Sequence, residues 1–282
     1  MVFLGTGAAG CKGSSGAKTS QPAAIGIEPW SVQPGEDRVW CKTMKVPVGA
    51  TLDVNSFTIT MAAGSHHFIL YRSTDNLPDG FGDCGDMNNI TFLTGSQTPG
   101  AVTNAYPAGL ALPLFSGEQL ILQSHYVNAS TSPIEAKVDV QMTTIPHDQV
   151  TDYVQTFLIV DSSFAIPPGT TGYTDGGKDL TETPNLKILS VSSHMHKRGI
   201  HFTIDESGAD MPVPERLFET TEWHAPPVAT FDPPRPTSAS HSLHYQCTWN
   251  NETASPIYFG PTTEDEMCIM VVTVFPALDY AP

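Results

Sequence analysis

Proline and glycine interrupt this chain so often that long helices are excluded. The 282 residues include 24 prolines and 23 glycines, spread along the sequence. Proline lacks the N–H that a helix interior needs, and glycine loses conformational entropy there. The apolar segments between them are short and alternate with a period of two, as in AKVDVQMTTI and QLILQSHYV. Short alternating segments between turns predict an all-β protein built from sandwiches.

The chain length and the distribution of strand-like segments indicate two domains. A chain of 282 residues fits one large domain or two ordinary ones, and strand-like segments resume on both sides of IPHDQVTDYV. We therefore expect a disordered tether over residues 1–27, an N-terminal domain over 28–150 and a C-terminal domain over 151–282. The hydrophobic content of 40% is enough to build a core in each.

The charge balance excludes several classes of partner. Asp and Glu number 29 against 13 Lys and Arg, which gives a net charge of -16. Nucleic-acid binding requires a basic footprint, and anionic membranes attract basic segments, so neither partner is expected. No apolar run approaches the roughly 18 residues of a transmembrane helix. An acidic excess of this size is typical of a protein whose net charge keeps it soluble.

The cysteines indicate an oxidising compartment. None of the five forms a CxxC pair, which argues against a zinc ribbon or a thioredoxin-type motif. Four of them form two well-separated pairs, one in each half of the chain. We interpret Cys41–Cys84 and Cys247–Cys268 as disulfides, which predicts a periplasmic or secreted protein.

The fifth cysteine, Cys11, follows the small residues AAG near the N-terminus. This segment resembles the cleavage box of a bacterial lipoprotein, in which the cysteine carries a lipid anchor. A disordered leader with an unpaired thiol is the alternative.

The segment LSVSSHMHKRGIHF places two histidines on one face of a predicted strand. Residues i and i+2 of a strand point the same way, so His194 and His196 project together, on the face of Ile188, Ser190 and Ser192. The opposite face carries apolar residues that can fill a core: Leu189, Val191 and Met195. Two imidazoles on one face can chelate a metal. Two exposed histidines without a ligand are the alternative.

Alternation also directs Met267 and His125 away from the core. If Cys268 turns inward to bond Cys247, its neighbour Met267 turns outward, where a thioether is a soft ligand. Methionine combined with imidazole suits Cu(I) better than zinc. His125 lies on the face opposite the apolar residues of its own strand: Leu120, Leu122 and Tyr126.

The adjacent residues His66 and His67 can bind one metal ion together only if the backbone departs from a regular strand. Neighbouring strand residues point to opposite faces, so joint ligation requires a β-bulge or a strand end. The remaining histidines belong to no motif and are assigned no ligand role: His147, His201, His224, His241 and His244.

Four segments occur in a distinctive order: GSHHFILYRS, LILQSHYVN, LSVSSHMHKRGIHF and TEDEMCIM. This series resembles the copper type II, ascorbate-dependent monooxygenases, the family of the peptidylglycine α-hydroxylating and dopamine β-monooxygenases. The similarity spans residues 28–280. It implies two tandem antiparallel β-sandwich domains of jelly-roll type, facing each other across a solvent-filled cleft with one copper on each wall.

The resemblance also assigns roles to the motif residues. It implies that His66, His67 and His125 hold an electron-transfer copper on the N-terminal domain. It further implies that a second copper, at which O₂ binds and the substrate is hydroxylated, is held by three ligands: His194, His196 and Met267. The expected co-substrates are O₂, a small organic molecule, and ascorbate or a similar reductant. By proximity, the candidates to orient the imidazoles are Gln123, Tyr126 and Glu266.

Three positions depart from the peptidylglycine enzymes. Ser192 stands where those enzymes grip the substrate carboxylate with arginine, and Ile269 and Val271 replace an asparagine and a tyrosine. We therefore expect a less polar substrate than a peptide carboxylate. Two other functions stay open, a non-catalytic extracytoplasmic copper-binding or storage protein and an adhesion-type sandwich module.

Overall fold

The computed structural model describes residues 22–280 except 50, 86, 88 and 178–185. The expected lipid-anchor cysteine, Cys11, lies outside the described residues, as does most of the tether expected over 1–27. The first strand, β1 (Pro22–Val32), begins before residue 28. No helix within the described ranges is long and apolar enough to cross a membrane.

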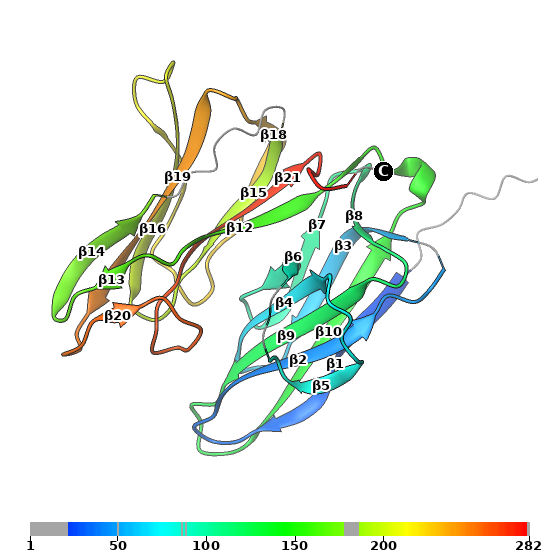
Figure 1. Ribbon diagram of the computed structural model, residues 1–282, viewed down its shortest axis with the longest axis horizontal. Helices are drawn as coiled ribbons and strands as arrows, with labels where there is room; N and C mark the ends of the chain where they lie inside the picture. Colours follow the sequence, from blue (N-terminus) through cyan, green and yellow to red (C-terminus); the bar gives the residue numbers. More distant parts are fainter. Residues whose placement is uncertain (1–21, 50, 86, 88, 178–185, 281–282) are drawn as a thin grey trace, which may run out of the picture.

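The first sandwich packs a six-stranded sheet against a five-stranded one (Figure 1). In the six-stranded sheet, the order is β1, β10 (Ile134–Thr144), β3 (Leu52–Met61), β8 (Leu110–Leu114) and β11 (Asp152–Tyr153), with β7 (Gly100–Ala105) also paired to β3. The other sheet has the order β5 (Gly80–Asp83), β2 (Asp37–Lys45), β9 (Gln119–Val127), β4 (Ser65–Ser73) and β6 (Ile90–Ser96). Alternate apolar residues of both sheets meet in one core, including Phe57, Ile59, Phe68 and Leu122.

The second sandwich has two four-stranded sheets and a short two-stranded one. One sheet has the order β12 (Gln155–Asp161), β21 (Cys268–Phe275), β15 (Lys187–His194) and β18 (Ala229–Pro236). Another has the order β14 (Thr170–Gly176), β19 (His241–Asn251), β16 (Gly199–Gly208) and β17 (Glu215–Thr220). The short sheet pairs β13 (Ala165–Ile166) with β20 (Ile257–Tyr258). Their core includes Phe202, Tyr245, Trp249 and Val272.

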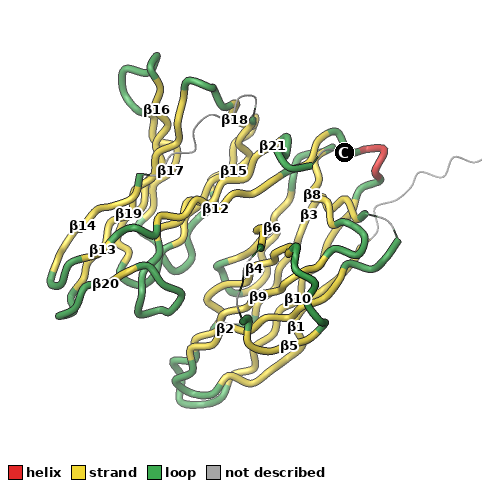
Figure 2. The backbone as a smooth tube through the Cα atoms, viewed as in Figure 1, coloured by secondary structure: helices red, strands yellow, loops and turns green. Residues whose placement is uncertain are grey.

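The predicted all-β class is confirmed. The single helical turn that the structure describes is the 3-10 turn His147–Gln149, which follows β10 and lies on the side of the first sandwich away from the second. Figure 2 shows strands and loops everywhere else in the described chain. All pairings between the strands above are antiparallel except β8 with β11. Because β11 still pairs with the first sandwich, the second sandwich begins with β12.

The two sandwiches touch along the sheet that contains β12, β15 and β21. Figure 1 shows this sheet on the side of the second sandwich that faces the first. Leu189 of β15 and Phe275 of β21 pack into the apolar core of the first sandwich. The two halves are therefore joined by shared apolar burial, the main favourable contribution to association in water.

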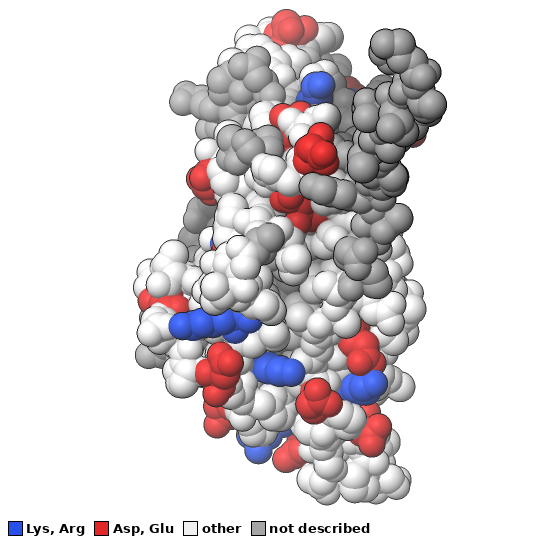
Figure 3. Space-filling view, turned by 90° about the vertical axis from the view of Figure 1, so that its right-hand side faces the viewer, with Lys and Arg blue, Asp and Glu red and all other residues white. Residues whose placement is uncertain are grey.

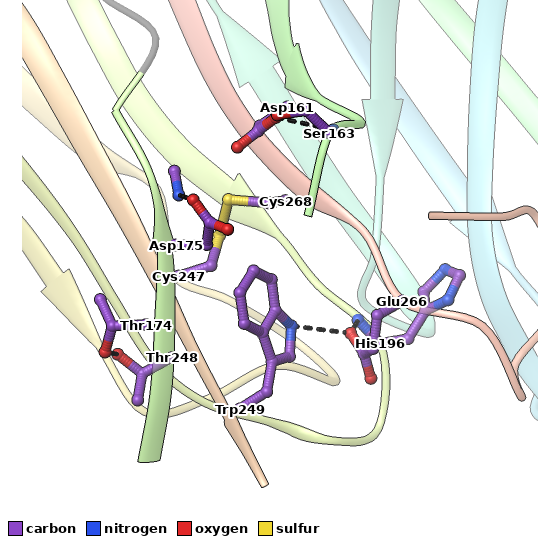
Figure 4. The surroundings of a disulfide bond; sticks show 11 residues. Asp161, Ser163, Thr174, Asp175, His196, Cys247, Thr248, Trp249, Glu266 and Cys268 are labelled. Atoms are coloured by element: carbon purple, nitrogen blue, oxygen red, sulfur yellow. Dashed lines mark hydrogen bonds between the residues drawn. A yellow bond between two sulfur atoms is a disulfide. The ribbon is translucent and has the colours of Figure 1, made fainter. Parts of the chain in front are cut away.

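Both predicted disulfides are confirmed. Cys41 on β2 is bonded to Cys84, and Cys247 on β19 is bonded to Cys268 on β21. The second bond crosses between the two large sheets of the second sandwich (Figure 4). Disulfides persist in oxidising compartments, so both bonds are compatible with an extracytoplasmic protein.

The same asparagine-centred turn occurs once in each sandwich. After β9 comes the segment NASTSP, and at the end of β19 comes NETASP. The Asn128 amide group donates to two backbone carbonyls, while its oxygen accepts from the N–H and the hydroxyl of Ser130. Asn251 repeats this pattern with Thr253. Both asparagines are buried, with exposed fractions of 2% and 0%.

Charged side chains are interspersed on the face shown in Figure 3. Lysine and arginine side chains there lie singly among aspartate and glutamate, and much of the face is uncharged. This face therefore presents no basic patch of the kind that nucleic acid requires.

Candidate metal centre

A β-bulge brings His66 and His67 to the same place. In the pairing of β4 with β9, Ser65 lies opposite Tyr126 but His67 lies opposite His125, so one extra residue is inserted at His66. A bulge of this kind re-aims side chains that would otherwise diverge. The three ring centroids lie 5.0 to 5.2 Å apart. The β-bulge that His66 and His67 need in order to bind one ion together is therefore present.

His125 leaves the first core as predicted. The apolar residues of β9 on the opposite face lie in that core: Leu120, Leu122 and Tyr126. His125 instead contacts the other histidines at the outer surface of this sheet, where strict alternation along β9 positions it.

The second histidine pair lies where β15 ends. His194 pairs with Ile269 of β21, and the same register continued would set His196 opposite Met267. The rings of His194 and His196 lie 5.2 Å apart. Met267 is partly exposed and directly precedes the buried Cys268, as the alternation argument requires.

One part of the alternation argument for β15 is wrong. A register shift between Ile188 and Ser190 reverses the faces of the residues before it. Ile188 therefore packs in the second core with Val191 and Met195, instead of sharing the face of the histidines. Leu189, which was expected on that core face, packs into the first sandwich.

The five predicted histidines form one cluster where the sandwiches meet. The ring of His66 lies 5.8 Å from that of His194 and 5.9 Å from that of His196. His67 also lies 5.8 Å from His194. The expected solvent-filled gap between the two groups of ligands is closed at this point. Within each of two groups, His66–His67–His125 and His66–His194–His196, the potential ligand atoms lie within 4.8 Å of one another.

Burial keeps most of these imidazoles neutral. His66, His125 and His196 are only 4%, 1% and 2% exposed. Burial, together with the neighbouring histidines, lowers the pKa of His66 to about 3. Burial is also the main cause that lowers the pKa of three others in the cluster: His67, His194 and His196. A neutral imidazole has a free lone pair, which is the form that binds metals.

In the group His66–His67–His125, which we call the N-terminal group, two rings each donate a hydrogen bond from Nε2 to a side-chain oxygen. His67 Nε2 donates to Gln123 Oε1 at 3.2 Å, and His125 Nε2 donates to Asp37 Oδ1 at 2.5 Å. Burial of Asp37 opposes its ionisation, but hydrogen bonds from His125 and Thr263 lower its pKa overall. These bonds leave Nδ1 of each histidine as the free nitrogen.

The same arrangement recurs in the C-terminal pair. His194 Nδ1 donates to Gln97 Oε1 at 2.5 Å, and His196 Nδ1 donates to the Asp265 carbonyl at 3.1 Å. Neither of these bonds uses Nε2 of the ring. Metal-bound histidines almost always donate their second nitrogen to a carboxylate or carbonyl in this way.

Two nitrogen atoms in the cluster are buried without any hydrogen-bond partner. They are His66 Nε2 and His67 Nδ1. Unsatisfied buried polar atoms are rare in native proteins, because each costs free energy unless a partner or an ion binds it. The cluster thus has the nitrogen donors and the unpartnered atoms that a metal ion requires, and burial favours the neutral form in four of its rings.

The expected supporting residues have different roles. Gln123 contacts His67 as expected. The Tyr126 hydroxyl donates to the Lys137 carbonyl inside the first sandwich, so it orients no histidine. Glu266 is fully buried and accepts hydrogen bonds from the backbone N–H of His196 and from the Trp249 ring, so it holds the chain and not an imidazole (Figure 4).

Sequence reasoning missed the loop that follows β17. The ring of His224 stacks at 6.2 Å from that of His66 with an interplanar angle of 17°, and Trp223 lies 6.3 Å from His66. His224 is exposed, so this loop lies between the cluster and solvent. The available signal was a tryptophan–histidine pair in front of the proline-rich segment APPVATFDPPRP.

Comparisons with known proteins give only weak likenesses. No family model and no curated protein matches the chain. The major capsid protein P2 of bacteriophage PM2 is 9% identical with a TM-score of 0.44, covering 93% of this chain and 100% of its own. N-glycanase F is 10% identical with a TM-score of 0.41, covering 90% of this chain and 95% of its own. Scores this low carry no argument about function.

Proposed function

We propose that this protein is a copper-dependent monooxygenase, which hydroxylates a C–H bond of a small organic substrate with O₂ and a two-electron donor such as ascorbate. One observation carries the proposal. Four imidazoles of the cluster each donate an N–H to a protein oxygen, which orients the ring, within a buried and largely neutral group. The order of the motifs resembles the copper type II monooxygenases.

The donor set fits copper. Two nitrogens that bind one ion at about 2.0–2.1 Å each are at most about 4.2 Å apart. The observed limit of 4.8 Å therefore requires the rings to move together by a few tenths of an ångström each. In this proposal His66, His67 and His125 hold one ion. The other ion is held by His194, His196 and Met267, whose thioether favours the cuprous state.

The overall reaction balances only with an external reductant. Converting C–H and O₂ into C–OH and water consumes two electrons and two protons, which ascorbate can provide. Copper bound at the cluster would supply one-electron transfer and oxygen activation. The protein's own contribution is orientation, because Asp37, Gln97 and Gln123 fix which ring nitrogens face the centre.

Neighbouring residues favour a substrate of low polarity. The Ser192 hydroxyl donates to the Pro227 carbonyl at 2.8 Å, so it is not free to grip a carboxylate. Val271 lies opposite Ser192 in the pairing of β15 with β21, and Ile269 lies opposite His194. This edge of the cluster therefore offers apolar contacts.

Oxygen uptake by the copper-loaded protein tests the proposal. We expect ascorbate-dependent O₂ consumption, and a product heavier by one oxygen atom with an accepted substrate. His194→Ala should abolish uptake. His201→Ala should retain it, because His201 bonds to Glu219 outside the cluster. Uptake that is equal in both variants would refute the role of the histidine cluster. Uptake absent from the copper-loaded wild type across a substrate panel would refute an enzymatic role.

The burial of the cluster favours a second candidate, a non-catalytic extracytoplasmic copper-binding or storage protein. Exposed fractions of 4%, 1% and 2% for His66, His125 and His196 leave little room for an organic substrate in this arrangement. Stoichiometric copper binding without ascorbate-dependent O₂ consumption would support this function instead.

A further inference from the structure

We propose that the two ligand groups form one dinuclear centre, with the ring of His66 close to both groups, instead of two separated copper sites. The inference rests on the proposed function only in taking copper as the metal. It concerns how close the two ions lie and does not require turnover. A neutral imidazole has one lone pair, so His66 binds only one of the two ions.

The distances between groups nearly equal those within them. Ring centroids within the N-terminal group lie 5.0 to 5.2 Å apart, and those of His194 and His196 lie 5.2 Å apart. His66 lies 5.8 and 5.9 Å from the latter two rings. It belongs to both groups of potential ligands, and its buried Nε2 has no hydrogen-bond partner. In two-metal sites the ions lie close together, about 3.5–4 Å apart.

Gln97, a residue of the first sandwich, holds the end of β15 next to the N-terminal group of histidines. Gln97 follows β6 in the first sandwich. Both the oxygen and the nitrogen of its side-chain amide form hydrogen bonds with residues of the second sandwich. Its oxygen accepts from His194 Nδ1 at 2.5 Å, and its nitrogen donates to the Ser193 carbonyl at 2.9 Å. The amide therefore orients a potential ligand of the opposite half.

Thr263 makes the reciprocal connection from the C-terminal side. Its hydroxyl donates to Asp37 Oδ2 at 2.7 Å. The other oxygen of Asp37 accepts from His125 Nε2 at 2.5 Å. Each half thus supplies a side chain that positions a histidine of the other half, either directly or through one carboxylate.

Apolar burial supports the same closed arrangement. Leu189 and Phe275 of the second half are 7% and 9% exposed and pack in the core of the first. Separating the halves would expose these side chains to water as well as break the two polar connections. Transfer of a large apolar side chain from a protein core to water is unfavourable, so this burial favours the closed arrangement.

Electron paramagnetic resonance of the full chain, titrated with Cu²⁺ alone, tests the inference. Two neighbouring cupric ions interact magnetically. We therefore expect two bound ions per chain, a half-field transition at the second equivalent, and a loss of signal per copper. Gln97→Ala should keep two ions but weaken the half-field transition. Thr263→Val, which removes only the hydroxyl donor, should act in the same direction. Thr98→Ala is the matched control, because Thr98 is the exposed neighbour of Gln97 and should leave the spectrum unchanged.

Two bound ions with full signal intensity and no half-field transition would overturn the shared centre, as would binding of a single ion. An unchanged spectrum in both Gln97→Ala and Thr263→Val would overturn the positioning roles. A coupled pair without oxygen uptake would reject the monooxygenase and keep the dinuclear centre. Uncoupled ions with oxygen uptake would reject the dinuclear centre and keep the monooxygenase.

Discussion

Replacement of Glu266 tests how the turn after β15 is anchored, without removing any histidine of the cluster. The carboxylate has an exposed fraction of 0%. Its Oε2 accepts from the His196 N–H at 3.0 Å and from Trp249 Nε1 at 3.1 Å, while Oε1 accepts from the Arg198 N–H at 2.7 Å. One buried side chain thus fixes the turn after β15 against the residue before Met267.

The expected cost follows from the number of donors that lose their acceptor. A buried donor left unsatisfied costs about 1–3 kcal/mol. Glu266→Ala abandons three donors, so the free energy of unfolding should fall by about 3–9 kcal/mol, with entering water reducing the loss. Glu266→Gln can keep Oε2 as a carbonyl oxygen and lose only the bond from Arg198, so it should cost about 1–3 kcal/mol.

Urea denaturation of the metal-free protein measures these differences. Glu264→Ala is a matched control, because the Glu264 side chain is 70% exposed and pairs with Lys197 and Arg198 at the surface. It should cost less than about 1 kcal/mol. Equal losses for Glu266→Ala and Glu264→Ala, or for Glu266→Ala and Glu266→Gln, would refute the assignment of three buried bonds to Glu266.

Three further predictions concern the ligands and the framework. Met267→Ala should lose one of two bound Cu(I) ions, measured by copper analysis of the reduced protein; equal loss of both would contradict its assignment to one ion. Asn251→Ala should lower the free energy of unfolding by roughly 2–4 kcal/mol in urea, because it removes buried bonds at the end of β19, whereas no change would contradict them. The pKa of His66 falls from 6.5 to about 3, so between these values the unfolded chain binds a proton that the folded chain does not. The metal-free protein should therefore lose stability as pH falls below 6.5, more steeply than His66→Gln in calorimetry at matched pH values.

Regular alternation made much of the fold and part of the site predictable. The apolar residues Leu120 and Leu122 lie in the first core, and this alone directs His125 to the other face. The same reasoning places Met267 outside the second core once Cys268 is bonded to Cys247. Strand β9 is regular, and Met267 directly precedes β21, so in both cases a period of two predicts the direction of the side chain.

Bulges and docking were beyond that reasoning. The register shifts at His66 and between Ile188 and Ser190 depend on the partner strand, and no local pattern in the sequence marks them. Gln97 meets His194 across 97 residues only because the two sandwiches dock. The closed cluster is a property of that docking, so the sequence could identify its histidines but not the closeness of His66 to both groups.

The paired asparagine turns have a practical consequence for producing the protein. Asn128 and Asn251 each begin an N-x-S/T sequon, the acceptor for a glycan in a eukaryotic secretory pathway. Their amide nitrogens donate inside the closed ends of the sandwiches, so a sugar attached there would displace those bonds and keep the turns open. The third sequon asparagine, Asn89, is exposed, and within the described part of the chain its amide nitrogen donates only to the Asp75 side chain at the surface, so a sugar there would displace no buried bond. Bacterial expression therefore avoids a modification that the two buried turns cannot accommodate.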